Sequence, residues 1–385
     1  MQLEFIGAFQ IVLGVIARFW PVWLALAIVF AASLFYRKKL GLYGQLFDSG
    51  VGVTGVFICL FWLFTAISAS WVAPFDPLAQ VPIMKDALPG AVVPDGGGVY
   101  LFGGDKLARD VFSRMVHGSQ IVLIIAPAAT AFALMVGATL GLPAGYYGGR
   151  IDSVLSFLAN LVLAFPVILL FYLLVTPGIV ETGLPRWMAG LFFLFPIIFF
   201  ATLFYTRFKN RPERLYLLLG LTILIGGWVY VGLVFDADPL GVISIAPNEL
   251  NIFVAVVFAS SPGVFRIVRG LVMDIKTRDY IAAAQTRGET PWYTMLWEIL
   301  PNARGPLIVD ACLRIGYTTI LLGTLGYFGL GLAPESPDWG TAIKDSSRLL
   351  RSFIHPALPP TFALMSFVLG LNLLADALRE QSMKD

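Results

Sequence analysis

Residues that could do chemistry are few in this sequence and stand far apart. The two histidines, His117 and His355, have no cysteine or carboxylate nearby at the spacing of a metal site, which favours two surface histidines over a nickel site. The two cysteines, Cys59 and Cys312, lie in apolar runs and imply neither a disulfide framework nor a metal cluster. The phosphate-binding loop Gly-x-x-x-x-Gly-Lys-Ser/Thr is absent, so we expect that the chain does not hydrolyse ATP itself. The sequence therefore predicts no catalytic site, no metal site and no cofactor held by this chain.

The composition is that of a membrane protein. Hydrophobic residues make up 58% of the 385 positions and charged residues only 13%, which excludes an ordinary soluble protein. Apolar runs of about twenty residues recur, the length that crosses a bilayer as a helix. The net charge of +2 gives no sign of a nucleic-acid partner. We predict an all-α polytopic membrane protein.

Nine apolar runs are expected to span the membrane. They are about 11–36, 51–72, 122–146, 151–175, 187–206, 215–235, 251–272, 307–332 and 358–377. Arg37, Lys38 and Lys39 follow the first run, and the loop 207–214 is strongly basic. Because basic loops stay on the cytoplasmic side, this distribution predicts an N-terminus outside, a C-terminus inside and a cytoplasmic 207–214 loop.

The N-terminal part leaves one alternative open. The first run contains Arg18 and Pro21, so the part before Phe19 could instead lie flat on the membrane as an interfacial helix. A cleavable signal peptide is not expected, because the start is not basic and no small-residue cleavage site follows. The longest stretch outside the membrane, about 73–119, is rich in proline and glycine, so we expect an irregular periplasmic segment there.

Small residues recur every four positions in the third run, at Ala133, Gly137, Gly141 and Gly145. They share one helical face, and small residues let the backbones of membrane helices approach closely. This face is predicted to pack against another helix, either within the chain or in a partner.

Residues 279–302 form a stretch with a helical pattern that is too polar for the bilayer. Its first half favours helix, and Gly288 can end that helix in the left-handed conformation. Thr290 is a good N-cap, and Pro291 suits the first position of a second helix, since its missing N–H costs nothing there. We expect this second helix to end at Pro301.

The hairpin resembles the cytoplasmic coupling loop of ABC-importer permeases, whose usual form is Glu-Ala-Ala, three residues, Gly, and later Ile-x-Leu-Pro. The usual glutamate is replaced by Ala282, so contact is expected to depend more on shape and on Arg287 and Glu289. The resemblance implies that the following residues couple to an ATPase: Ala282, Ala283, Ala284, Arg287, Gly288, Glu289, Ile299, Leu300 and Pro301. The plainer alternative is a soluble hairpin that joins two membrane helices.

A second stretch, FGGDKLARDVFSRMVHGSQI, resembles the GTDxxGRDVFSRxxxGxR signature of the permease subfamily that serves oligopeptides, dipeptides and nickel. Ala108 replaces a glycine of the pattern and Gln120 an arginine. The matching residues are Asp105, Arg109, Asp110, Val111, Phe112, Ser113, Arg114 and Gly118. Later matches to the same family are Phe165, Pro166, Phe328, Gly329, Leu330, Gly331, Pro334, Pro337, Trp339, Gly340, Asn372, Asp376 and Arg379.

The resemblance covers about residues 73–175 and 251–379. It implies a six-helix type I importer permease core, with an extra N-terminal span and an inserted helix pair at 187–235 outside it. On this basis we divide the chain into N-terminal spans (1–72), a periplasmic segment (73–119) and a permease domain (120–380) that contains the coupling hairpin (279–301).

The resemblance also implies function and partners. The chain would be a permease subunit of an ATP-driven importer of peptides or peptide-like solutes in the bacterial inner membrane. Expected partners are a second homologous permease, two ATP-binding subunits that hold ATP and Mg, and a periplasmic solute-binding protein. That protein is expected to dock near Asp105, Arg109, Asp110, Arg114, Trp339 and Gly340.

Two alternatives come from other classes. An ion-coupled secondary transporter would favour carboxylates near the bilayer midplane and an inverted repeat, and we see few of the former and none of the latter. A membrane scaffold without transport leaves the ordered motifs unexplained. Asp310 and Arg314 share a helical face and could pair, or both could be hydrated at the interface. The sequence does not identify the substrate.

Overall fold

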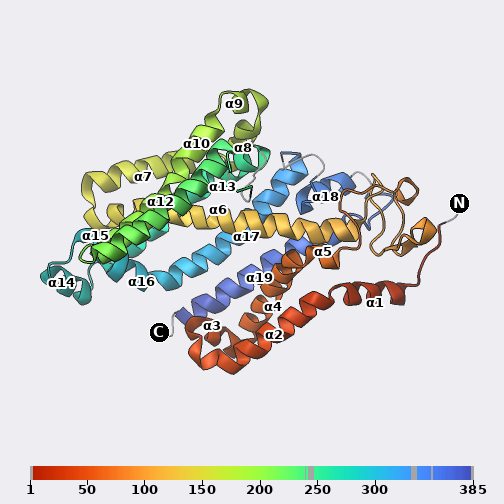
Figure 1. Cartoon of the computed structure of the whole chain (residues 1–385), viewed down its shortest axis with the longest axis horizontal. Helices are drawn as coiled ribbons and strands as arrows, with labels where there is room; N and C mark the ends of the chain where they lie inside the picture. Colours follow the sequence, from red (N-terminus) through yellow and green to blue (C-terminus); the bar gives the residue numbers. More distant parts are fainter. Residues whose placement is uncertain (1–2, 239, 242–246, 331–335, 348–349, 383–385) are drawn as a thin grey trace. The chain divides into compact units, whose positions relative to one another are not determined.

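The computed structural model describes residues 3–238, 240–241, 247–330, 336–347 and 350–382. This part of the chain is almost entirely helical (Figure 1). It forms two compact units, which we call the first unit (residues 1–127 with 312–385) and the second unit (residues 128–311). The helices α6 (Val111–Tyr147) and α17 (Arg304–Phe328) each contribute to both.

Eight helices among the described residues are long and apolar enough to cross a membrane, or nine if one bent pair is counted as a span. The bent pair is α7 (Gly149–Leu163) and α8 (Val167–Val175), and it turns by 81°. The break contains Pro166, which has no N–H to donate and forces the preceding residue out of the helical conformation. The fourth run is therefore bent at Pro166, one of the residues that match the family.

The first unit packs short and long helices around α4 and α19. Its elements besides the shared α6 and α17 are α1 (Ala8–Arg18), α2 (Trp20–Tyr36), η1 (Arg37–Lys39), α3 (Gly41–Gln45), η2 (Leu46–Asp48), α4 (Gly50–Ile67), α5 (Ala69–Val72), η3 (Pro82–Met84), β1 (Ala91–Val92), η4 (Pro94–Gly96), β2 (Val99–Tyr100), α18 (Trp339–Ser347) and α19 (Leu358–Ser382). A Cβ atom on Gly55 of α4 would lie 2.7 Å from the backbone nitrogen of Leu374 in α19. Only a glycine at position 55 allows this close packing.

Two boundaries in the first unit bear on the predictions. The first run breaks at Phe19 between α1 and α2, the point at which the alternative of a separate first helix divides it. Pro21 explains the break, since a proline near the start of α2 cannot continue the hydrogen bonds of α1. The irregular segment that begins at residue 73 ends at Asp110 rather than at Ser119, because Asp110 caps α6 by accepting a 2.9 Å hydrogen bond from the backbone N–H of Ser113.

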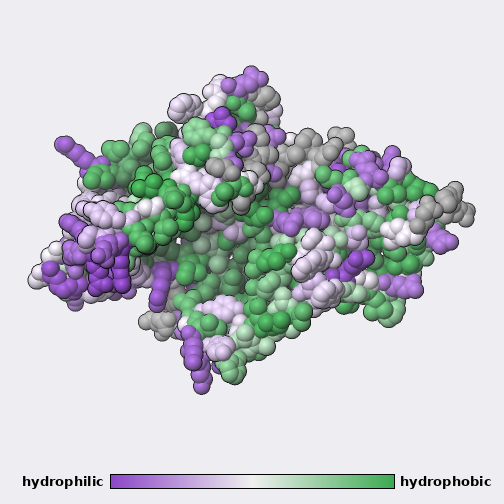
Figure 2. Space-filling view, in the orientation of Figure 1, coloured by the Kyte–Doolittle hydropathy of each residue, from purple (hydrophilic) through white to green (hydrophobic). Residues whose placement is uncertain are grey.

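The second unit contains the inserted helices and the hairpin. Its elements after α6 are α7, α8, α9 (Pro177–Glu181), α10 (Leu184–Phe192), α11 (Leu194–Phe208), α12 (Pro212–Phe235), α13 (Pro247–Ile275), α14 (Asp279–Thr286), α15 (Pro291–Tyr293), the π-helix η5 (Thr294–Ile299), α16 (Leu300–Asn302) and the start of α17. Hydrophobic surface covers much of α12, whereas hydrophilic residues gather over α14 and α15 (Figure 2).

The small-residue face of α6 packs within this chain, against α13. Gly137 lies against Val264, and Cβ atoms on Gly141 and Gly145 would lie 2.9 Å and 2.7 Å from the Cβ atoms of Val268 and Val272. Real Cβ atoms do not approach so closely, so the spacing of these two helices requires glycine at both positions. Of this pair, α13 leads directly into the hairpin.

Candidate functional site

The hairpin (residues 279–302) turns at a Schellman motif. Gly288 has a φ of +79°, the left-handed conformation that was predicted for it. The backbone N–H of Gly288 donates to the carbonyl of Gln285 over 2.9 Å, and that of Glu289 donates to the carbonyl of Ala284 over 3.3 Å. These two bonds satisfy carbonyls that the end of α14 would otherwise leave free. A Cβ atom on Gly288 would meet nothing within 4 Å, so the position needs glycine for its backbone and not for space.

The second arm of the hairpin (residues 291–302) begins as predicted and ends differently. Thr290 is the N-cap, with its side chain accepting from the backbone N–H of Tyr293, and Pro291 is the first helical residue. The arm then becomes a π-helix over Thr294–Ile299 and continues through Pro301 to Asn302. The prediction that Pro301 ends the helix is therefore wrong. The π turn changes the hydrogen-bond register just before Pro301, and a proline is tolerated where that register changes.

The hairpin has one buried apolar face and one exposed face. Ile281, Ala284, Met295 and Ile299 are fully buried and pack against the ends of α6 and α13. The outward face is exposed and carries Ala282, Ala283, Thr286, Arg287 and Gly288. Small side chains on this face leave the α14 backbone open to close contact from another protein.

Polar contacts fix the hairpin to the end of α6. The Nζ atom of Lys276 donates to the carbonyl of Gly145 over 2.7 Å, where α6 has carbonyls without helical partners. Gln285 donates to the hydroxyl of Tyr146 over 3.0 Å. Within the hairpin, Arg287 pairs with Glu298 over 2.9 Å. The hairpin is therefore continuous in packing with the helices that lead into it.

The first unit contains a buried group of charges at the start of α6. Arg109 is 1% exposed, and its Nε atom donates to Asp105 over 2.7 Å. Its Nη2 atom donates to Asp345 of α18 over 3.1 Å, and Lys106 pairs with the other oxygen of Asp345 over 2.7 Å. Arg114 donates to the carbonyl of Ser336 over 3.2 Å. This ion cluster joins the segment before α6 to α18.

Trp339, one of the later matches to the family, lies beside this cluster. The indole N–H of Trp339 donates to the carbonyl of Met115 over 2.9 Å. A Cβ atom on Gly118 would lie 2.5 Å from the indole ring, and the ring of Trp62 meets Trp339 edge-on with centroids 5.1 Å apart. Gly118 and Trp339, which both match the family, therefore pack on each other.

Burial corrects the prediction that these motif side chains themselves form a docking surface. Asp105, Arg109, Asp110, Arg114 and Trp339 are all less than 5% exposed. Gly340 is also buried, because it lies against the backbone carbonyl of Gly323. These residues hold α6 and α18 together, and only neighbours such as Leu107 reach the surface. The matches Gly331 and Pro334 lie outside the described residues.

Asp110 has an unusual environment for a carboxylate. It accepts hydrogen bonds from the backbone N–H and the hydroxyl of Ser113, at 2.9 Å and 2.6 Å. Its second oxygen is buried without a partner. Burial raises the pKa of Asp110 from 3.8 to about 6, although the bonds from Ser113 act in the opposite direction.

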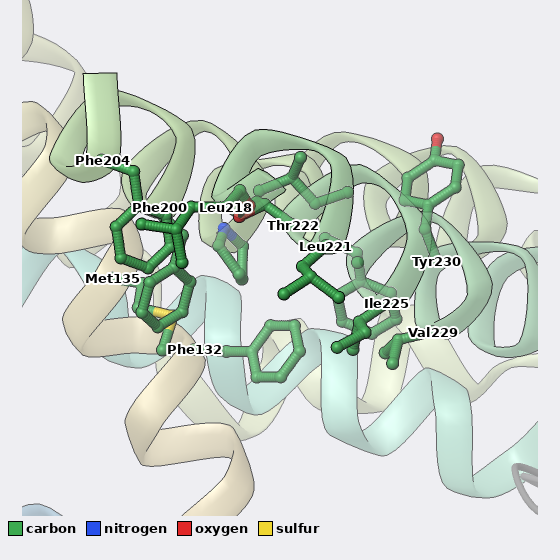
Figure 3. A pocket seen from close by; sticks show the side chains of 14 residues that line it. Phe132, Met135, Phe200, Phe204, Leu218, Leu221, Thr222, Ile225, Val229 and Tyr230 are labelled. Carbon is green, nitrogen blue, oxygen red and sulfur yellow. Dashed lines mark hydrogen bonds between the residues drawn. The ribbon is translucent and has the colours of Figure 1, made fainter. Parts of the chain in front are cut away.

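The second unit also contains an apolar cavity of about 440 Å³ between α6, α11 and α12. Phe132, Leu221 and Ile225 are among the side chains that line it (Figure 3). The hydroxyl of Thr222 is already bonded to the carbonyl of Leu218 over 2.8 Å. With no charged group in its lining, this cavity is unsuited to the charged ends of a peptide. Within the described residues, no three histidines, cysteines or carboxylates are grouped to hold a metal ion.

Several residues of these sites had no signal in the sequence. Asp345, Lys276 and Arg207 all make contacts with residues far along the chain. Their partners became neighbours only through the tertiary packing of α18, α13 and α11. In the ion cluster, Asp105 and Arg109 lie in one sequence motif, whereas Asp345 lies far along the chain and is not part of it.

Comparisons with known proteins agree on one family. Residues 137–382 match the family described as the binding-protein-dependent transport system inner membrane component. The di/tripeptide transport system permease protein of Pseudomonas aeruginosa is 28% identical over 352 residues, which cover 90% of this chain and 93% of that protein. The dipeptide transport system permease protein of Alkalihalophilus pseudofirmus is 27% identical, covering 88% and 87%. The glutathione transport system permease protein of Pectobacterium atrosepticum is 27% identical, covering 72% and 70%.

Proposed function

Because the chain belongs to the family of binding-protein-dependent transport system inner membrane components, we propose that it is the permease subunit of an ATP-driven importer of short peptides. The family and the apolar helices make it a multi-pass protein of the bacterial inner membrane. The similar permeases named for dipeptides, di/tripeptides and glutathione support the substrate class. The binding-protein-dependent family also favours this function over an ion-coupled secondary transporter.

The hairpin is the proposed contact with an ATP-binding subunit. One observation carries this assignment: the hairpin buries one face on α6 and α13 and leaves the face of Ala282, Ala283 and Arg287 uncovered. A rigid hairpin of this kind can pass a displacement of the ATP-binding subunit to the helices continuous with it. ATP and Mg would be held by that subunit, and this chain would contribute no group to the hydrolysis of ATP.

The remaining partners follow from the same proposal. A second, homologous permease would complete the translocation path, and a solute-binding protein would deliver the peptide. The surface proposed for the binding protein is the exposed part of the segment before α6, where Ile83, Leu88 and Leu107 are open. The ion cluster would hold this surface in place from beneath.

Cross-linking of two neighbouring alanines tests the hairpin assignment. Ala283 is exposed and Ala284 is fully buried on the same helix. In a background with Cys59 and Cys312 replaced by alanine, Ala283→Cys should cross-link to the ATP-binding subunit that co-purifies. Ala284→Cys is the matched control and should not cross-link. A transport-competent complex in which Ala283→Cys gives no cross-link would contradict the assignment.

A further inference from the structure

Helix α11 of the α11–α12 pair meets the second arm of the hairpin through three contacts. The Nη1 atom of Arg207 donates a hydrogen bond of 2.8 Å to the hydroxyl of Tyr293. The guanidinium also lies over the indole of Trp297, with its Cζ atom 4.9 Å from the ring centroid. The indole N–H of Trp297 in turn donates to the hydroxyl of Thr206 over 3.2 Å. Two consecutive residues of α11 therefore hold two residues that share one face of the arm.

Arginine is suited to this position in a way that lysine is not. Its planar guanidinium can stack on an aromatic ring while its edge donates a hydrogen bond. Arg207 does both, to Trp297 and to Tyr293. Trp297 belongs to the π-helix Thr294–Ile299. Such π-helical turns are rare. Since Trp297 lies within this one, contacts from α11 that fix Trp297 also fix the register of the turn.

The opposite end of α11 is anchored in an aromatic cluster. The ring of Phe193, just before α11, lies edge-on to Phe253 of α13 with centroids 5.5 Å apart. It also meets Phe132 of α6 with centroids 5.0 Å apart, and Phe132 meets Phe253 at 5.3 Å. Aromatic pairs with this geometry are favourable beyond the area that they bury. The α10–α11 junction is therefore tied to α6 and α13, the two helices on which the hairpin packs.

Between these two attachments, two apolar cavities lie beside α11. The cavity of about 440 Å³ shown in Figure 3 lies on one side, with Phe200 and Phe204 of α11 in its wall. A second apolar cavity of about 340 Å³ lies against Phe199 of the same helix. The polar and aromatic contacts that tie α11 to the hairpin, α6 and α13 lie near its two ends.

We propose that α11–α12 is a brace that spans from the Phe132–Phe193–Phe253 cluster to the second arm of the hairpin, with Arg207 as its positioning residue. The brace holds the arm at Tyr293 and Trp297, in addition to the attachment of the hairpin to α6 and α13. The inference that this affects transport rests on the proposed function of the hairpin. The structural part of the inference does not.

Hydrogen exchange of the purified complex tests the structural part directly. Arg207→Ala should increase amide exchange in residues 291–302 and leave α14 close to wild type. Lys209→Ala is the matched control, because it removes an exposed cation from the same loop. Equal exchange in Arg207→Ala and Lys209→Ala would overturn the brace, whatever the hairpin does in transport.

The functional part is tested in reconstituted vesicles with loaded binding protein. Arg207→Ala should reduce the ratio of stimulated to basal ATPase activity roughly three- to tenfold, at unchanged basal activity. Arg207→Lys should restore little of that ratio, since lysine cannot stack and donate in the same way. The double variant Arg207→Ala/Tyr293→Phe should lose no more than Arg207→Ala alone, because both changes remove the same contact.

The Gly288→Val variant, measured in the same vesicles, separates the two claims. If Gly288→Val abolishes stimulation and Arg207→Ala behaves as wild type, the brace is wrong and the proposed function of the hairpin stands. If neither variant changes stimulation, the hairpin does not couple and the functional part of the brace falls with it. If the double variant Arg207→Ala/Tyr293→Phe loses more stimulation than Arg207→Ala alone, the direct Arg207–Tyr293 link is also contradicted.

Discussion

Gly141 of α6 lies directly against Val268 of α13, and a Cβ atom on Gly141 would be 2.9 Å from the Cβ atom of Val268. No real pair of Cβ atoms tolerates this distance, so the two backbones touch only because Gly141 has no side chain. The sequence left open whether this face met a helix of the same chain or of a partner. The structure shows an intrachain contact between α6 and α13, the two helices on which the hairpin packs.

The first prediction follows from this contact. Gly141→Leu should force α6 and α13 apart and destabilise the protein by about 1–3 kcal/mol, the usual cost of overpacking. The measurement is the apparent melting temperature of the purified complex in detergent. Gly270→Leu, on the open side of α13 where a Cβ atom would meet nothing within 4 Å, is the matched control. Equal melting temperatures for the two variants would show that the close contact is not required.

The ion cluster gives a second prediction. Arg109→Ala would remove the buried cation that lies nearest to Asp105 and donates to Asp345, which should cost about 3–5 kcal/mol. Arg37→Ala removes an arginine from the pair Arg37–Asp48, whose side chains are 45% and 50% exposed, and should cost under about 1 kcal/mol. Thermal unfolding of both variants checks the difference. A similar small effect in both would mean that the buried pairs contribute nothing beyond a surface pair.

Asp110 gives a pH-dependent prediction. Its pKa is raised to about 6 in the folded protein from 3.8, so the folded state keeps a proton that the unfolded state has already lost. The stabilisation by this proton is complete below about pH 3.8 and is lost as the pH rises through about 6. Its size is on the order of 3 kcal/mol. Stability should therefore fall between these pH values.

Asp110→Asn should remove this part of the pH dependence, because the amide resembles the protonated acid and can still accept from Ser113. The variant should melt higher than wild type at pH 7.5 and close to wild type at pH 4.5. Asp274→Asn, which changes an exposed carboxylate, is the control. Parallel curves for wild type and Asp110→Asn over this range would contradict the assigned pKa.

Local signals explain which features could be predicted from the sequence. The left-handed Gly288, the Thr290 cap and the Pro291 helix start each depend on one residue and its immediate neighbours. The ion pair Arg109–Asp345 joins residues 236 positions apart, and no local pattern contains both. The match to the family's sequence motifs identified Asp105 and Trp339 but gave no information on whether their side chains are buried. A surface role was therefore predicted for side chains that are inside.

The second arm of the hairpin also has one end that local sequence rules predict and one that they do not. Thr290 and Pro291 mark its start by rules that depend on the backbone alone. Its passage through Pro301 depends on a π turn, for which the sequence has no signal. The contact between Arg207 and Tyr293 joins positions 86 residues apart and needs the inserted pair to be placed first.

The central claim is that the hairpin couples this chain to ATP hydrolysis, and its corner gives the most direct test. Valine at position 288 meets no steric obstacle from neighbours but is poorly suited to a φ of +79°. Gly288→Val should therefore misdirect the second arm without disturbing the membrane helices. Gly288→Asn is the matched control, because asparagine tolerates the left-handed conformation.

The measurement is ATPase stimulation by loaded binding protein in reconstituted vesicles, together with uptake of a short peptide. Wild type and Gly288→Asn should show stimulation and uptake, whereas Gly288→Val should remain near the unstimulated rate and take up no peptide. Normal stimulation and uptake in a Gly288→Val complex that still contains the ATP-binding subunit would contradict the coupling role of the hairpin.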